Sequence, residues 1–154
     1  MNFFNILKVF FISALPILEI RGALPLALTV YHLPFFVAFL ICFLGNIFPV
    51  FFLMILLEKV VFYFSRFKIF QRIFSWYFNR TDEKFKKSFE KWGKLALIIF
   101  VALPLPLTGA WTGSVAAFLM KFNKKEAFFL ISFGVFLAGL IVSCLFYFGK
   151  IIVS

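Results

Sequence analysis

The sequence predicts an all-α membrane protein, and three observations lead to that fold class. Hydrophobic residues make up 64% of the 154 residues and charged residues only 14%, more apolar surface than a soluble chain of this length can bury. Apolar runs of more than twenty residues recur, whereas the strands of a transmembrane β-barrel are short and alternate in polarity. Two of these runs are interrupted near their centres by proline, glycine or charged residues.

Four apolar blocks organise the chain, at residues 3–30, 33–57, 95–120 and 127–148. The second and fourth are long enough to cross the hydrocarbon core as helices. The first block has Lys8 as its only early positive charge and no small-x-small cleavage site after it. We therefore interpret it as a retained segment and not as a signal peptide.

The third block carries four helix-interrupting residues at its centre: Pro104, Pro106, Gly109 and Gly113. Each proline removes a backbone donor and clashes with the preceding turn. We expect two half-helices, at residues 95–103 and 111–120, each reaching about half of the hydrocarbon thickness. The alternative is one kinked helix that crosses the membrane.

Charge favours the re-entrant arrangement of the third block. Residues 58–94 hold ten Lys or Arg against four acids, and short basic connections stay in the cytoplasm. Lys121, Lys124 and Lys125 follow the third block directly. Both basic clusters lie on the cytoplasmic side only if the block enters and leaves the membrane on the same face.

The first block is interrupted in a similar way, by Pro16, Glu19, Arg21, Gly22 and Pro25. Ala14-Leu15-Pro16 parallels Ala102-Leu103-Pro104, and residues 39–45 parallel residues 129–134. We therefore expect an inverted repeat of a re-entrant hairpin plus a transmembrane helix, an architecture found in many secondary transporters. The single membrane domain, residues 1–154, then divides into repeat 1 (1–58), a cytoplasmic basic connector (59–94) and repeat 2 (95–154).

The connector is predicted to contain a basic amphipathic helix that lies in the membrane interface. In residues 62–78, polar side chains recur at steps of three and four and leave aromatic side chains on the other face. A second short helix is expected at residues 82–92, with Gly93 as its C-terminal stop. The net charge of +10 is then explained by anionic lipid headgroups as partners, and nucleic acid is not expected.

Glu19 and Arg21 are the strongest candidates for a functional site. A charge near the bilayer centre is costly, so such residues pair, line a cavity or take part in transport. A direct ion pair that only locks the hairpin is the structural alternative. The other predicted site residues are Asn46 and the polar residues of the third block: Thr108, Trp111 and Thr112. Backbone N–H groups near Gly109 and Gly113 would favour an anion, as Arg21 would.

Catalytic sites are not predicted. His32 is the only histidine, so no metal site or Ser/His/Asp triad can be assembled, and no cofactor is expected. A phosphate-binding loop of the G-x-x-x-x-G-K-S/T type does not occur in the sequence. Proton coupling through Glu19 is the only energy source that the chain itself indicates.

Two segments resemble the bacterial family of small multidrug export proteins: residues 14–25 (Ala-Leu-Pro-Ile-Leu-Glu-Ile-Arg-Gly-Ala-Leu-Pro) and residues 100–113 (Phe-Val-Ala-Leu-Pro-Leu-Pro-Leu-Thr-Gly-Ala-Trp-Thr-Gly). That family is similar to the DedA superfamily, whose members have two re-entrant hairpins and include proton-linked lipid flippases. The resemblance implies the same hairpins here. DedA proteins carry a functional arginine in the second hairpin region, which residues 95–120 lack. Their mechanism would transfer to this chain only if Arg21 took over the anion-binding role.

The sequence thus predicts a multi-pass transporter of the bacterial inner membrane, either an export carrier or a lipid flippase, with a small molecule or a lipid phosphate as substrate. The alternative is a membrane scaffold or assembly factor that binds anionic lipid. A homodimer is left open.

Overall fold

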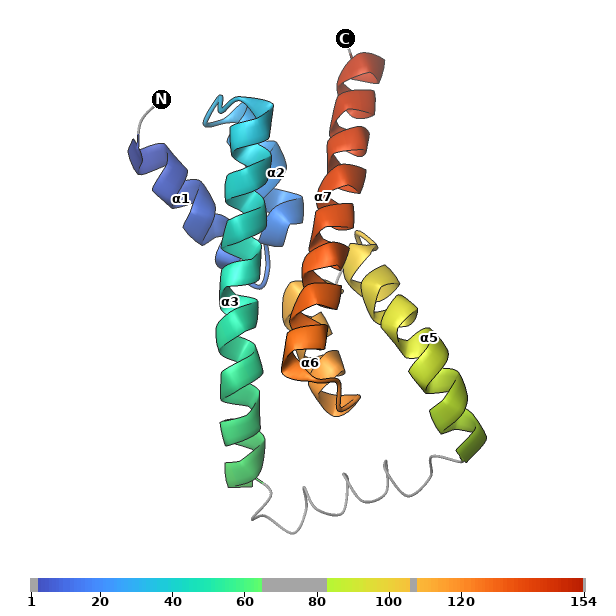
Figure 1. The fold of residues 1–154 in the computed structure, drawn as a ribbon. Coiled ribbons are helices and arrows are strands. Elements are labelled where there is room, and N and C mark those ends of the chain that lie inside the picture. Colours follow the sequence, from blue (N-terminus) through green and yellow to red (C-terminus); the bar gives the residue numbers. More distant parts are fainter. Residues whose placement is uncertain (1–2, 65–82, 106–107, 154) are drawn as a thin grey trace.

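The computed structural model describes residues 3–64, 83–105 and 108–153, and every regular element within them is an α-helix (Figure 1). The helices in chain order are α1 (Phe3–Ala14), α2 (Glu19–Thr29), α3 (Phe35–Phe64), α5 (Glu83–Ala102), α6 (Ala110–Leu119) and α7 (Lys124–Val153). The predicted all-α class is confirmed for these residues. Most of the predicted interfacial helix, from residue 65 onward, lies outside the described residues.

Two shorter helices followed by a helix of 30 residues occur twice along the chain. In the first half α1 and α2 form a helical hairpin ahead of α3, and in the second half α5 and α6 form one ahead of α7. Figure 1 shows α3 and α7 running in opposite directions, with each hairpin beside the starting half of its own long helix. The two hairpins therefore approach the centre of the bundle from opposite ends.

The long helices contain the two stretches, Phe35–Leu57 and Lys124–Gly149, that are long and apolar enough to cross a membrane. They match the second and fourth apolar blocks. Large apolar side chains such as Phe36, 84% exposed, and Phe129, 71% exposed, point away from the core. Outward-facing aromatic side chains are expected where the surrounding medium is lipid.

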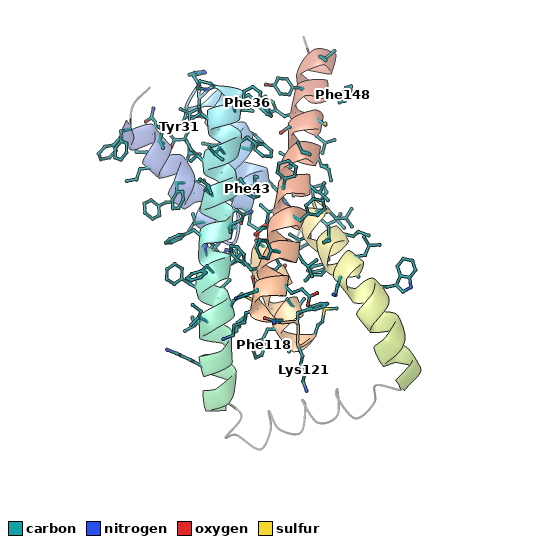
Figure 2. The ribbon with its side chains drawn as sticks, viewed as in Figure 1. Tyr31, Phe36, Phe43, Phe118, Lys121 and Phe148 are labelled. Atoms are coloured by element: carbon teal, nitrogen blue, oxygen red, sulfur yellow. The ribbon has the colours of Figure 1, made fainter. Side chains whose placement is uncertain are left out.

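Figure 2 places Phe118 and Lys121 at the end of the bundle where α3 finishes and α5 begins. Tyr31, Phe36 and Phe148 lie at the opposite end. The basic turn between α6 and α7 and the described start of the second half therefore lie at the same end of the molecule.

The predicted interruption of the third block is found where the sequence places it. Helix α5 ends at Ala102 and α6 begins at Ala110, close to the predicted limits of 103 and 111. Pro104 lies in the connection, whereas Pro106 is outside the described residues. The proline-containing connection ends α5 because no proline nitrogen can donate to a helix carbonyl.

The predicted helix stop at Gly93 is wrong. Helix α5 continues through this residue, which is buried. A glycine inside a helix costs only about 1 kcal/mol, and the contact of α5 with α7 offsets that cost. Next to Gly93, Lys94 forms an ion pair with Glu126 of α7 and ties the two helices together.

The first block is interrupted only at residues 15–18. The expectation that the block would also be interrupted at four later residues is wrong, since all of them lie inside α2: Glu19, Arg21, Gly22 and Pro25. Pro25 has no N–H to donate to the carbonyl of Arg21, four residues earlier. The helix continues past this missing bond to Thr29, whose hydroxyl donates a hydrogen bond of 2.8 Å to the Pro25 carbonyl.

Two glycines set the closest contacts between each hairpin and its long helix. A Cβ on Gly45 of α3 would overlap the backbone oxygen of Phe10 in α1. A Cβ on Gly134 of α7 would lie 2.7 Å from Val101 Cβ and 3.0 Å from the backbone oxygen of Ile98 in α5. Gly45 and Gly134 end the two parallel stretches noted in the sequence, so both halves cross their helices at corresponding positions.

Alanine at either crossing point should force the helices apart. We expect Gly45→Ala and Gly134→Ala each to lower the free energy of unfolding in detergent by roughly 1–3 kcal/mol, the usual cost of overpacking. Gly149→Ala is the matched control, since a Cβ there meets nothing within 4 Å. Equal stability of all three variants would show that the crossings are not close-packed.

Candidate functional site

Glu19 is buried at the start of α2, with 5% of its surface exposed. Its carboxylate reaches across to the second hairpin, where Oε1 accepts a hydrogen bond of 3.4 Å from the backbone N–H of Trp111. The N–H of Ala110 bonds to the same carboxylate. Both donors belong to the first turn of α6, so a side chain of the first repeat caps the positive end of a helix in the second.

Backbone conformation on both sides makes this contact possible. Glu19 has a φ of 47°, in the left-handed region that costs a non-glycine residue about 1–3 kcal/mol. Gly109, directly before α6, has a φ of 132°, and a Cβ there would overlap the Glu19 carboxylate. Position 109 therefore requires glycine both for its conformation and for the approach of the carboxylate.

Arg21 binds the other side of the break in the third block, at the end of α5 and in the connection that follows it. Its guanidinium donates from Nη1 to the carbonyls of Leu105 at 2.6 Å and Thr108 at 3.0 Å, and from Nη2 to the carbonyl of Val101 at 3.0 Å. Val101 lies in the last turn of α5. Carbonyls at a helix C-terminus lack partners within the helix, and a cation there also meets the negative end of the dipole.

Trp111 makes the reciprocal contact. Its indole Nε1 donates to the carbonyl of Ala14, the last residue of α1, at 3.1 Å. Ala14 and Ala102 stand in the parallel Ala-Leu-Pro motifs of the two halves, and Ala102 follows the Val101 that Arg21 caps. Each hairpin thus supplies the side chain that caps the first helix of the other hairpin.

Glu19 and Arg21 do not bind each other. The ion pair found among the described residues is that of Lys94 and Glu126, and the opposite charges of Glu19 and Arg21 attract without direct contact. The alternative of a locking Glu19–Arg21 ion pair is therefore wrong. Neighbouring positions on one helix point in different directions, so the two side chains reach opposite ends of the interrupted block.

The other predicted site residues divide into two groups. Thr108 joins the site, because its carbonyl accepts from Arg21 and its hydroxyl lies 2.8 Å from the carbonyl oxygens of Leu103 and Leu105. Thr112 is exposed and its hydroxyl bonds within the turn, 3.4 Å from the Gly109 carbonyl. Asn46 is fully buried in α3, with no hydrogen-bond partner for its side chain among the described residues.

The residues predicted to shape the hairpin backbone have unequal roles. Gly109 is required as described, and a Cβ on Gly113 would lie 2.5 Å from Val101 Cγ2, which keeps α6 close to α5. A Cβ on Gly22 would meet only the flexible side chain of Leu18. Pro16 and Pro104 lie exposed in the connections between helices.

Sequence reasoning missed the acceptors Val101, Leu105 and Ala14 because they are backbone carbonyls of apolar residues, which carry no side-chain signal. Their closeness to the Ala-Leu-Pro breaks is an indication, since helix ends leave carbonyls without partners. The part of the chain that the structure describes holds no cluster of three or more His, Cys, Asp or Glu residues for a metal.

Because Glu19 and Arg21 cap different helix ends, removing both should not restore stability. We expect Arg21→Ala to lower the free energy of unfolding by about 2–3 kcal/mol and Glu19→Ala by about 1–2 kcal/mol. The double variant should be less stable than either. Lys94→Ala, which removes an exposed ion pair, should cost about 1 kcal/mol or less. Recovery of thermal stability in the double variant would instead mean that the two charges pair directly.

Comparison with known proteins gives one match. No curated protein and no solved structure matches the chain. A family model described as "Putative small multi-drug export protein" matches residues 19–141. This range begins at Glu19 and includes Arg21 and the whole of the second hairpin. The match covers well over half of the 154 residues, and the chain therefore belongs to this family of small multi-drug export proteins.

Proposed function

We propose that the protein is a small proton-linked carrier of the bacterial inner membrane, which exports a small molecule or flips a lipid phosphate. The observation that carries this proposal is the contact between the hairpin tips. Glu19 binds the start of α6, and Arg21 binds the end of α5. Buried charges within apolar helices are costly and are found where transport takes place. The family description and the two candidate membrane spans support the same function.

The repeated helix order supports an inverted repeat of two re-entrant hairpins. In this arrangement α3 and α7 cross the membrane and the hairpin tips meet near its midplane, as the substrate sites of many transporters do. Alternating access then consists of one hairpin moving against the other. The tips hold each other through five hydrogen bonds between a side chain and the backbone. The movement therefore has to exchange these hydrogen bonds for others.

Glu19 is suited to control that exchange. As a carboxylate it attracts the N–H groups at the start of α6, and as a neutral acid it would bind them far more weakly. Protonation would therefore release the start of α6, where an anionic group of the substrate could replace the carboxylate. Arg21 keeps its charge throughout and holds the other end.

The proposed topology can be tested without knowledge of the substrate. Single cysteines in place of Lys87, in α5, and of Lys124, at the start of α7, should both react with a membrane-impermeant thiol reagent only from the cytoplasmic side. Cys42 and Cys144, both free, are first replaced with alanine. Reaction of the two positions on opposite faces would make the third block a simple span and would exclude the inverted repeat.

Transport can be measured in liposomes under an imposed pH gradient, with a lipophilic drug cation and a short-chain lipid phosphate as candidate substrates. Glu19→Gln should abolish the response to the gradient but keep substrate binding. Arg21→Lys keeps the charge but loses the planar fork, so an anion carrier should lose affinity. Lys94→Gln should transport like the unmodified protein. Absence of flux for both substrates would favour the alternative function, a scaffold that binds anionic lipid.

A further inference from the structure

Three side chains contain buried polar atoms without hydrogen-bond partners among the described residues. They are Nε of Arg21, both amide atoms of Asn46 and the hydroxyl of Ser132. Asn46 has no exposed surface at all. A buried polar group without a partner is costly, and most such groups in folded proteins are satisfied by protein or by water. Three of them together require an explanation.

These side chains come from α2, α3 and α7, which all contact one another. Aromatic contacts show which sides of α3 and α7 face each other. The ring centroid of Phe136 in α7 lies 5.6 Å from that of Phe39 and 6.1 Å from that of Phe43, both in α3. Phe39 also lies against Gly139 of α7. The two long helices run antiparallel in Figure 1.

The helical periodicity then places Asn46 opposite Ser132. Asn46 follows Phe43 by three residues and Phe39 by seven, so it lies on the α3 face that meets α7. Ser132 precedes Phe136 by four residues and therefore lies on the α7 face that meets α3. Because the helices are antiparallel, both positions are displaced from the aromatic contact toward the same end of the bundle, at about the same level.

The missing partner of Ser132 is not a general property of serines in these helices. Ser143, also in α7, donates its hydroxyl to the carbonyl of Gly139, four residues earlier, at 2.6 Å. Ser114 in α6 does the same with Ala110 at 2.7 Å. Serines inside helices commonly make this local bond, and Ser132, although its hydroxyl is buried, does not.

We propose that Asn46 and Ser132, which face each other between α3 and α7, form a hydrated site that gives water access to the hairpin tips. The amide supplies a donor and an acceptor, and the hydroxyl supplies both. A water molecule needs two to four such partners. Apolar groups and quaternary ammonium ions neither donate nor accept hydrogen bonds, so they would leave these polar atoms without partners. As an aqueous route to Glu19, the site rests on the proposed carrier function, but its hydration can be tested without transport.

The first test measures water access directly. In a Cys42→Ala, Cys144→Ala background, Asn46→Cys and Ser132→Cys are treated in proteoliposomes with a hydrophilic methanethiosulfonate reagent, with Ser143→Cys as the matched control. The cysteine thiolate attacks the reagent, forms a mixed disulfide and releases methanesulfinate, and the thiolate forms readily only in contact with water. We expect both site positions to react at least about tenfold faster than the control. Equally slow reaction at all three positions would overturn the proposal.

The second test distinguishes a hydrated site from a hidden structural contact. Replacing Asn46 with leucine, of similar size, removes amide groups that no protein atom satisfies, so the melting temperature in detergent should rise by roughly 3 °C. A fall in melting temperature would mean that Asn46 has a structural partner, and the proposal would be wrong. Rapid labelling without any flux in the liposome experiment keeps the hydrated site but rejects the carrier. Flux without labelling would keep the carrier and reject the hydrated site.

Discussion

The fold depends on one constraint: a helix that ends inside an apolar bundle leaves backbone groups without partners, and the apolar side chains around them offer none. The ends of α1 and α5 and the start of α6 lie near the centre of the bundle. Arg21, Trp111 and Glu19 satisfy these ends. The charged residues are therefore required by the broken helices, and the breaks are tolerated because of the charged residues.

The caps also explain the glycines that the sequence places around the breaks. Gly109 lets a carboxylate approach the start of α6, and Gly113 and Gly134 let Val101 pack between α6 and α7. With Val101 fixed in this way, its carbonyl is held where the guanidinium of Arg21 reaches it. The backbone of the second hairpin is thus positioned by close packing, and the polar contacts follow from that position.

Much of this fold could be predicted from the sequence because hydrophobic length and proline position act locally. The candidate spans in α3 and α7 and the break between α5 and α6 follow from such local signals. The continuation of α5 through Gly93 could not be predicted, since contact with α7 and the Lys94–Glu126 pair decide it. The site was predicted in part: Glu19, Arg21, Thr108 and Trp111 meet, but their partners are backbone groups that no residue type reveals. Ser132 gave no signal at all, because its missing partner is visible only in three dimensions.

The exchange of caps between the halves has a consequence for the order in which the protein is made. Ribosomes make the first hairpin and α3 before residues 83–119 exist, so Arg21 and Glu19 are made before the backbone groups that later bind them. During this interval other groups have to satisfy both charges. The repeated helix order would suggest two independent halves, yet here the earlier half is completed only by the later one.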